Sequence, residues 1–424
     1  MFKKFLLKKL AEATRQYFAA HPDIRLIIVI GSIGKTTTKI DIANVLSRQY
    51  MVRMYEGEPK SRIDTMLQLM GVEYPNGASK HSIFAWLTVL KAVKRRIKDP
   101  SDAQYIIQEL DPWGPGAATW FAGILQPDIA VVSGINHGVL RGFSSIEDKA
   151  KEVLEVANFC KYVLLNRDDS EGRFASFLNN PNITTYGTDG NAEHRYIDKN
   201  SNLEVGYEGV LASPLLQSEL AVAFRVFGEN NLRPAIAAAV IGLLAGMSPA
   251  QVSEAVSYLR PLPGRMNILR GVRDSTIIDD SFGATYPSAM AALQMLYLHM
   301  APQRIAVFGD MLATPEEHEA LGAHCDGMEL QWVVTVGELA NRYIAPQAKA
   351  QSCQVRSFKN ALAASVFIAG VLEKDALILF KGKSEGVYLE EAIKAILHST
   401  ASEKLLPRQT EKERAAKAAA FAVE

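Results

Sequence analysis

One glycine-rich segment constrains this chain more than any other feature of its sequence. Gly31-Ser32-Ile33-Gly34-Lys35-Thr36-Thr37 directly follows a continuous apolar run at residues 26–30, which is typical of a buried parallel strand. Residues 39–50 then read as a helix. In a strand–loop–helix of this kind, backbone N–H groups face a bound phosphate and the helix N-terminus adds favourable partial charge. The sequence therefore predicts a phosphate-binding loop that takes a nucleoside triphosphate, namely ATP.

The side chains of this loop predict how the nucleotide is held. Lys35 is expected to reach the β- and γ-phosphates, and the Thr36 hydroxyl to ligate Mg²⁺. A full pattern would have a glycine five residues before Gly34, where this chain has Val29, so the loop is a shortened variant. The alternative is a glycine turn before an ordinary helix, which the buried strand and the Lys-Thr-Thr-Thr run disfavour. The predicted nucleotide contacts in the loop are Gly31, Ser32, Ile33, Gly34, Lys35, Thr36 and Thr37.

Short apolar runs alternate with helical stretches along the rest of the chain. They lie at residues 105–107, 129–132, 162–165, 276–278, 304–308, 332–336 and 376–380. This alternation predicts parallel sheets with crossover helices and ligands at the carboxyl ends of the strands. We expect an α/β fold, with a P-loop parallel-sheet central ATPase domain followed by a smaller Rossmann-like α/β domain. Pro261-Leu262-Pro263-Gly264-Arg265 is the predicted hinge between them.

These patterns divide the chain into four parts. We expect an N-terminal amphipathic helix at 1–22, the central ATP-binding domain at 23–260, a C-terminal domain at 261–400 and a charged tail at 401–424. The N-terminal helix is basic and is expected to pack on its own domain; the alternative is contact with a membrane surface. The tail is rich in Lys, Glu and Ala without core residues, so we expect a frayed helix or disorder.

Composition excludes several classes of protein. Forty-six basic residues balance 46 acidic residues, which argues against a nucleic-acid binder. No apolar run reaches the roughly 18 residues of a membrane-spanning helix. The three cysteines, Cys160, Cys325 and Cys353, have neither a zinc-type spacing nor a disulfide pattern, so a reducing cytoplasm is the expected location. The sequence does not reveal the oligomeric state.

Carboxylates at two strand ends are candidates for the chemistry. Glu109 closes the run at 105–108, and in combination with the loop it is a candidate Mg²⁺ ligand. Asp279-Asp280-Ser281 ends the first strand of the second domain. Paired acids at a strand end facing an ATP site could bind ribose or an attacking amine. The alternative is a turn that caps a helix.

Several segments in consistent order, from about residue 24 to 396, resemble the Mur ligases, and most closely the MurF type, which adds D-alanyl-D-alanine to peptidoglycan precursors. Besides the phosphate loop and the Pro-x-Pro-Gly-Arg hinge, four stretches carry the resemblance. They are Asn166-Arg167-Asp168-Asp169, Asp279-Asp280-Ser281-Phe282 with Pro287-Ser288-Ala289-Met290, Ala306-Val307-Phe308-Gly309-Asp310-Met311-Leu312 with Glu316-Glu317-His318, and Lys381-Gly382-Lys383-Ser384. The N-terminal domain that holds the UDP-sugar in MurF enzymes is expected to be absent.

The resemblance implies an ATP-dependent ligase that forms a carbon–nitrogen bond. A substrate carboxylate would become an acyl phosphate, and the amine of an amino acid or dipeptide would attack it to give an amide, ADP and phosphate. Such catalysis consists mostly of positioning and charge neutralisation. The resemblance assigns Lys35 to the phosphates, Thr36 and Glu109 to Mg²⁺, and Asn231, Arg265 and Asp280 to the nucleotide.

The chain departs from the family pattern around a second metal. The family's histidine ligand aligns with Val139, and His137, two residues earlier, is the candidate replacement ligand and catalytic residue. The alternative for His137 is a solvent-facing loop histidine. The family's carbamylated lysine aligns with Val153, and Lys151 lies on a different helix face, so we do not expect carbamylation.

Three function classes remain open from the sequence. The leading one is a Mur-type ligase for a peptidoglycan precursor or another carboxylate acceptor. The second is a Mur-like homologue that binds ATP without full ligase activity and serves as a scaffold or partner subunit, which Val139 and Val153 favour. The third, a P-loop motor or partition ATPase, explains the phosphate loop but none of the later motifs.

Overall fold

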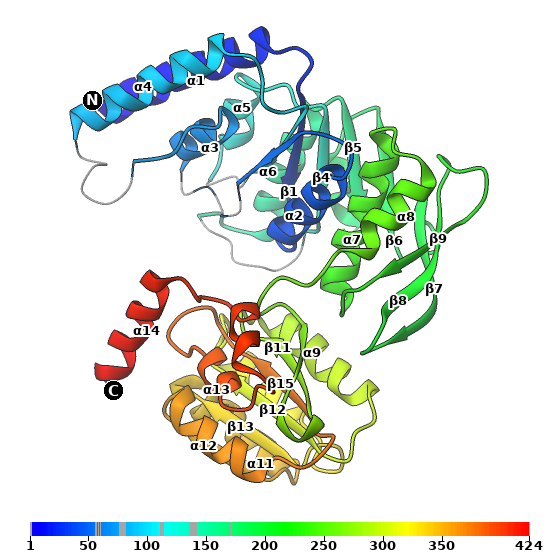
Figure 1. The fold of residues 1–424 in the computed structure, drawn as a ribbon, viewed down its shortest axis with the longest axis vertical. Coiled ribbons are helices and arrows are strands. Elements are labelled where there is room, and N and C mark those ends of the chain that lie inside the picture. The colour runs from blue at the N-terminus through cyan, green and yellow to red at the C-terminus, as the bar shows by residue number, and fades with distance from the viewer. Residues whose placement is uncertain are drawn as a thin grey trace. The chain divides into compact units, whose positions relative to one another are not determined.

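A computed structural model describes residues 2–423 except 56, 58, 60, 76–81, 111–113, 136–141 and 170–171. The chain forms two compact units (Figure 1). The first comprises Met1–Arg225 and Leu232–Leu259, and the second Val226–Asn231 and Arg260–Glu424. Each unit contains a largely parallel sheet with helices, which confirms the predicted α/β class.

A mixed sheet organises the first unit. Within the described residues it has nine strands in the order β2-β3-β1-β4-β5-β6-β7-β8-β9. Strand β1 is buried along almost its whole length, as its continuous apolar sequence predicts. The bounds are β1 Arg25–Ile30, β2 Val52–Met54, β3 Tyr105–Glu109, β4 Ile129–Val132, β5 Tyr162–Asn166, β6 Ile183–Gly187, β7 His194–Asn202, β8 Gly206–Ala212 and β9 Leu220–Phe224.

Strands β7, β8 and β9 form an antiparallel extension that was not among the predicted strands. β7 pairs with β6 only through Tyr186 and Gly187, so the extension continues the parallel sheet at one edge. Its strands alternate exposed and buried residues less regularly than a one-sided sheet would. This irregularity explains why β7 and β8 were not predicted. Strand β9, Leu-Ala-Val-Ala-Phe, is a continuous apolar run and was overlooked.

Helices complete the first unit. Their bounds are α1 Phe2–Ala20, α2 Lys35–Leu46, α3 Arg62–Leu69, α4 Ile83–Lys98, α5 Ala117–Ala122, α6 Ile146–Asn158, α7 Glu229–Leu244 and α8 Pro249–Ser257, with a 3₁₀ helix at Gly172–Phe177. The first three residues of α7 belong to the second unit. The Ser145 hydroxyl caps α6, and Ser248 caps α8 in a reciprocal box with Gln251. Helix α2 starts at Lys35, four residues before the predicted start.

A smaller sheet forms the core of the second unit. In the described chain its order is β10-β11-β15-β12-β13-β14. All neighbouring pairs are parallel except β10 with β11. The strands are β10 Asn267–Arg270, β11 Thr276–Asp280, β12 Arg304–Gly309, β13 Trp332–Val336, β14 Val355–Phe358 and β15 Leu377–Lys381; the helices are α9 Tyr286–Leu298, α10 Pro315–Ala323, α11 Ala345–Ala350, α12 Ala361–Val371, α13 Glu390–Lys394 and α14 Glu411–Val423.

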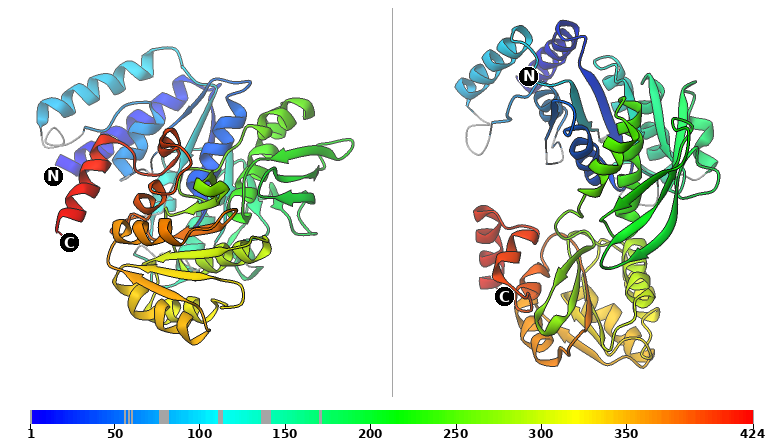
Figure 2. Two further views of the ribbon diagram at one scale, coloured as in Figure 1. Left: turned by 60° about the horizontal axis from the view of Figure 1, so that its bottom comes forward. Right: turned by 45° about the vertical axis from the view of Figure 1, so that its right-hand side comes forward.

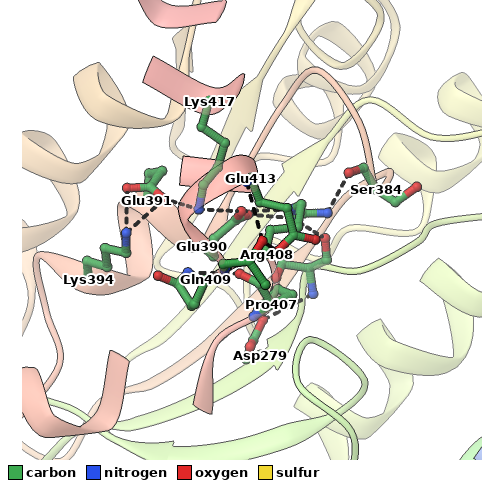
Figure 3. Close-up of polar contacts among 12 residues, drawn as sticks. Asp279, Ser384, Glu390, Glu391, Lys394, Pro407, Arg408, Gln409, Glu413 and Lys417 are labelled. Carbon is green, nitrogen blue, oxygen red and sulfur yellow. Dashed lines mark hydrogen bonds and ion pairs between the residues drawn. The ribbon is translucent and has the colours of Figure 1, made fainter. Parts of the chain in front are cut away.

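The tail does not match the expectation of a segment without core residues. It forms a 3₁₀ helix at Thr400–Leu405 and then α14, and Leu406 and Lys417 are buried. Arg408 and Lys417 both pair with Glu390, which is fully buried (Figure 3). Charged residues therefore anchor the tail to α13. The prediction for the tail rested on its lack of apolar core residues, so it could not include an anchor made by ion pairs.

The N-terminal segment forms α1, whose apolar face joins the core of the first unit. Leu6, Leu10 and Tyr17 are buried there, and α1 packs beside α3 and α4. The expectation of a helix packed on its own domain is confirmed. Among the described residues, no helix is both long and apolar enough to cross a membrane.

Candidate functional site

The glycine loop lies between β1 and α2, at the carboxyl edge of the first sheet. Gly31 has a φ of 141°, and a Cβ atom there would lie 2.4 Å from the Ser133 hydroxyl oxygen, so only glycine fits. Gly34 is left-handed, with a φ of 74°, and no side chain caps the start of α2. The loop therefore presents backbone N–H groups at a helix N-terminus, as phosphate binding requires.

A buried hydroxyl group that has no hydrogen-bond partner in the described chain indicates whether this loop suits a phosphate. The Oγ atom of Ser32 is buried and has no hydrogen-bond partner in the described part of the chain. A buried hydroxyl without a partner is costly, and a phosphate oxygen would accept its hydrogen bond. The Ser32 backbone N–H donates to the Gly134 carbonyl at 2.7 Å, which fixes the loop against β4. These residues fit the triphosphate of ATP.

Glu109 lies under the loop, at the end of β3. Strand β3 pairs directly with β1, with Glu109 opposite Val29. The carboxylate of Glu109, 1% exposed, accepts the Thr36 hydroxyl at 3.1 Å and lies 3.8 Å from the Lys35 ammonium. The Lys39 ammonium lies 3.7 Å from Oε2 of Glu109, the oxygen that accepts the Thr36 hydroxyl, and it donates to the Gly57 carbonyl at 3.0 Å. The structure thus brings together Lys35, Thr36 and Glu109, as the sequence predicted, and adds Lys39.

Lys39 is the residue that sequence reasoning missed at this site. It lies in the Lys-Thr-Thr-Thr-Lys run, one helical turn after Lys35, so the two ammonium groups share a helix face. Both cations lie within 4 Å of the buried Glu109 carboxylate, Lys35 at 3.8 Å and Lys39 at 3.7 Å. A cluster of an acid, a hydroxyl and nearby backbone could hold Mg²⁺ through oxygen atoms.

The segment after β5 supports the loop from the other side. The Asn166 amide donates to the Ser133 carbonyl at 2.7 Å and to Asp169 at 2.9 Å. Arg233 pairs with Asp168 at 3.2 Å and with Asp169 at 3.1 Å. The Asn-x-Asp-Asp turn therefore holds β4 and α7 in place within the first unit.

Burial alone would raise the pKa of Asp168. The backbone N–H groups of Thr188 and Asp189, the Thr188 hydroxyl and the Arg233 cation outweigh burial, and the pKa of Asp168 is lowered. A carboxylate with so many donors is satisfied in its charged form. Asp168 therefore acts as an anionic anchor for the turns around it.

Three motif segments meet at the carboxyl edge of the second sheet. Strands β11, β15 and β12 are neighbours there. Asp280 accepts the Lys381 ammonium at 2.6 Å and the Met266 backbone N–H at 3.2 Å. Asp310 pairs with Lys383 at 3.2 Å. The predicted Asp-Asp-Ser, Gly-Asp-Met-Leu and Lys-Gly-Lys stretches therefore form one edge of the second unit.

Asp279 is the buried member of its acid pair. Its carboxylate accepts the Ser281 hydroxyl at 2.6 Å and the Gly264 N–H at 3.1 Å. Burial raises the pKa of Asp279 to about 7, against the hydrogen bonds from Ser281 that lower it. Of the two acids, only Asp280 has an ion pair, and Asp279 fastens the hinge loop to β11.

The hinge positions Asn231 and Arg265 together in the second unit. Asn231, 3% exposed, donates its amide to the Phe227 and Arg265 carbonyls, each at 2.9 Å. The Arg265 guanidinium lies over the Phe282 ring, 5.6 Å from its centroid. The Asn231 amide N–H groups are thus used by the backbone, which leaves its side-chain oxygen as the group for a ligand.

The structure describes some of the residues considered for a second metal site and not others. His137 and Val139 lie outside the described residues. Val153, where the family's lysine aligns, is fully buried in the core of the first unit, and Lys151 is exposed on α6. The described residues contain no cluster of three or more His, Cys, Asp or Glu side chains that could hold a metal.

Comparison with known proteins identifies the family. The Mur ligase middle domain matches residues 29–242, and the Mur ligase glutamate ligase domain matches residues 264–384. The chain is 26% identical over 417 residues to the UDP-N-acetylmuramoyl-tripeptide–D-alanyl-D-alanine ligase of Bacillus subtilis, covering 93% of this chain and 80% of that protein. The Escherichia coli ligase of the same name is 23% identical over 381 residues, covering 88% and 76%.

Solved structures share the fold. MurF from Acinetobacter baumannii superposes with a TM-score of 0.71 at 19% identity, covering 92% of this chain and 79% of that one. MurF from Thermotoga maritima in complex with ADP gives 0.68 at 17% identity, covering 92% and 83%. Together with the family domains and the loop geometry, these matches establish that the chain belongs to the Mur ligases, ATP-dependent ligases that form carbon–nitrogen bonds.

Proposed function

We propose that this chain joins the amine of D-alanyl-D-alanine to the carboxylate of a muramoyl-peptide precursor at the expense of ATP. The observation that carries this proposal is the buried Glu109 between Lys35, Lys39 and Thr36 beneath the glycine loop. The names of the relatives, which cover most of this chain, supply the acceptor and the amine.

The phosphates of ATP are assigned to the glycine loop. The backbone N–H groups at the start of α2, the Ser32 hydroxyl and the Lys35 ammonium would contact them. Mg²⁺ is assigned to the Thr36 hydroxyl and Glu109, and His137 is a further proposed ligand. Bound together, ATP and Mg²⁺ supply a transferable phosphoryl group and neutralise its charge.

Lys35 and Lys39 contribute fixed positive charge near the transferred group. Charge that is already in place costs no reorganisation during the reaction. Asp280 and Arg265 belong to the second unit, and we assign them to the nucleotide by their match to the family motifs. Asn231 would contact the nucleotide through its side-chain oxygen.

A direct assay tests the proposal. Purified protein is given Mg·ATP, UDP-N-acetylmuramoyl-tripeptide and D-alanyl-D-alanine, and phosphate release and the ligated product are measured. We expect turnover only when both substrates are present, and a loss of about a hundredfold or more in Lys35→Ala. The matched control Lys151→Ala removes an exposed lysine from α6 and should keep full turnover.

A second candidate is an ATP-binding homologue without full ligase activity. The burial of Val153 in the core favours it, because the family's lysine cannot occupy that position here. If ATP binds but neither this substrate pair nor other carboxylates and amines stimulate phosphate release, the ligase proposal is wrong and the second candidate stands.

A further inference from the structure

Two helices of the first unit expose large apolar side chains that the ligase site does not use. On α4, Ile83 is 66% exposed, Phe84 80% and Leu87 57%. On α1, Phe2 is 48% exposed and Phe5 52%. Each helix buries a different set of side chains in the core of the unit, including Leu6 and Leu10 of α1 and Trp86 and Val89 of α4. The exposed apolar side chains are therefore not the ones that pack each helix on the core.

The exposed side chains lie at one end of a helix pair. Helices α1 and α4 pack side by side, and their N-terminal ends lie at the same end of the pair (Figures 1 and 2). The exposed apolar residues all belong to the first turn or two of each helix. They form a common apolar end, which we define as Phe2, Phe5, Ile83, Phe84 and Leu87.

The same two helices concentrate positive charge. Residues 2–20 carry five basic side chains and one acidic side chain, and residues 83–98 carry five basic and no acidic ones. Asp99 and Asp102, directly after α4, pair with Arg95 and Arg96. The ten basic residues, set against Glu12, Asp99 and Asp102, therefore leave seven net positive charges on this helix pair, which the rest of the chain offsets. A neutral protein with its cations gathered on one helix pair has a local electrostatic attraction for anionic surfaces.

The order of residues along each helix separates the apolar end from the cations. On one face of α4, Phe84 and Leu87 are followed by exposed Lys91 and Lys94. At 1.5 Å per residue, Lys91 lies about 10 Å behind Phe84 along the helix axis. This roughly matches the polar headgroup layer, which is about 5–8 Å thick on each side of a bilayer. On α1, Phe5 is followed by Lys9, whose ammonium lies 5.9 Å from the ring centroid.

We propose that the apolar end of α1 and α4 docks this protein on the surface of an anionic lipid bilayer. The phenylalanine, isoleucine and leucine side chains enter the boundary of the hydrocarbon, and the lysines behind them reach the lipid phosphates. A nucleic acid would use the cations but gain little from Ile83 and Leu87, since contacts to a phosphate backbone are polar. Binding is peripheral and reversible, and it is separate from the ligase reaction.

Vesicle co-sedimentation of the full chain tests the proposal. We expect binding to vesicles of phosphatidylcholine mixed with phosphatidylglycerol, weak or no binding to phosphatidylcholine alone, and release as salt screens the charges. The double variants Phe84→Ser with Leu87→Ser, and Lys91→Glu with Lys94→Glu, should each weaken binding about tenfold or more.

Matched controls change equally exposed residues of the second unit. Met300, 96% exposed, and Met328, 88% exposed, are changed to Ser, and Lys349 and Lys374 are changed to Glu; these variants should bind like wild type. Because all of these side chains are exposed, thermal unfolding and ligase turnover in solution should stay the same. Equal binding by every variant, equal binding to neutral vesicles, or binding to duplex DNA without binding to anionic vesicles would overturn the proposal.

Discussion

Single residues at the glycine loop explain why a shortened phosphate loop still works. Gly31 and Gly34 provide the backbone conformations, and Ser32 offers a buried hydroxyl with no protein partner in the described chain. Glu109 lies between Lys35 and Lys39 in a site where each of these charges is largely removed from water. Solvent screens the attraction between such charges only weakly, and this attraction must offset the free energy that it costs to remove them from water.

Glu109→Gln should raise the Mg²⁺ concentration needed for turnover and lower turnover at saturating Mg²⁺ by about a hundredfold. The amide keeps the shape but loses the negative charge that the metal requires. A Mg²⁺ titration of phosphate release measures both effects. Glu155→Gln on α6 makes the same chemical change away from the loop, and its titration should match wild type. An unchanged Mg²⁺ dependence in Glu109→Gln would remove this residue from the metal site.

Asp279 should make stability depend on pH. Its folded pKa is raised to about 7 and its ordinary value is 3.8, so the folded state holds a proton that the unfolded state has lost. The contribution is present in full below the unfolded pKa and is lost as pH rises from about 4 to about 7. Urea unfolding across this pH range should show the decline, and Asp279→Asn should flatten it. A decline of equal slope in the variant would assign the effect to other groups.

At the scale of elements, the C-terminal segment holds loops of the second unit together. Arg408 pairs with Glu390 and donates to the Ser384 carbonyl at 2.5 Å (Figure 3). It also lies over the Phe282 ring, 5.1 Å from its centroid. Pro407 approaches the hinge so closely that a Cβ atom on Gly264 would lie 2.9 Å from its ring. One short segment thus contacts the hinge, the loop after β11 and the loop after β15.

Arg408→Ala should destabilise the second unit by about 3–5 kcal/mol, because it leaves the fully buried Glu390 with one of its cations removed. Lys412→Ala removes an exposed cation from the same segment and should change stability by less than about 0.5 kcal/mol. Thermal or urea unfolding of the full chain measures both. Equal stability of the two variants would mean that the tail is not an anchor.

Helix α6 carries a valine at the position of the family's lysine, and the packing of that helix explains why. Val153 is fully buried among the apolar residues that join α6 to the sheet. Val153→Lys should therefore cost several kcal/mol of stability, because an ammonium group would lose its hydration in an apolar environment. Lys151→Ala on the exposed face of α6 should be nearly neutral in the same unfolding measurement. A stable Val153→Lys protein with improved turnover would show instead that this position faces the reaction centre.

At the scale of the molecule, the chain has two units with separate cores. Binding of a nucleotide at the glycine loop should stabilise the folded protein. A non-hydrolysable ATP analogue with Mg²⁺ should raise the unfolding temperature, since a ligand at a hundred times its Kd adds about 2.7 kcal/mol to the stability of the state that binds it. Lys35→Ala should remove most of the shift, and Lys151→Ala should keep it. Differential scanning fluorimetry measures the effect. An equal shift in all three proteins would place the nucleotide elsewhere.

Much of the fold could be read from local patterns. The strands at the apolar runs named above and the alternation of strand and helix appear where they were predicted, within a few residues. Each of these features depends on residues close together in the sequence. The weakly patterned strands β7 and β8 were missed, because their exposure alternates irregularly.

The sequence by itself determined the kind of fold, the phosphate loop and the family motifs, because hydrophobic periodicity and glycine conformation are local properties. Only the tertiary structure decided which of these features meet. Strand order brings Glu109 to Thr36, 73 positions earlier in the chain, as the strand-end position and the family resemblance predicted. Only the tertiary structure adds Lys39 to this site and buries Val153. The tertiary structure also packs the charged tail on Glu390 and leaves the ends of α1 and α4 exposed. Such pairings depend on which surfaces are buried together, and no local pattern contains that information.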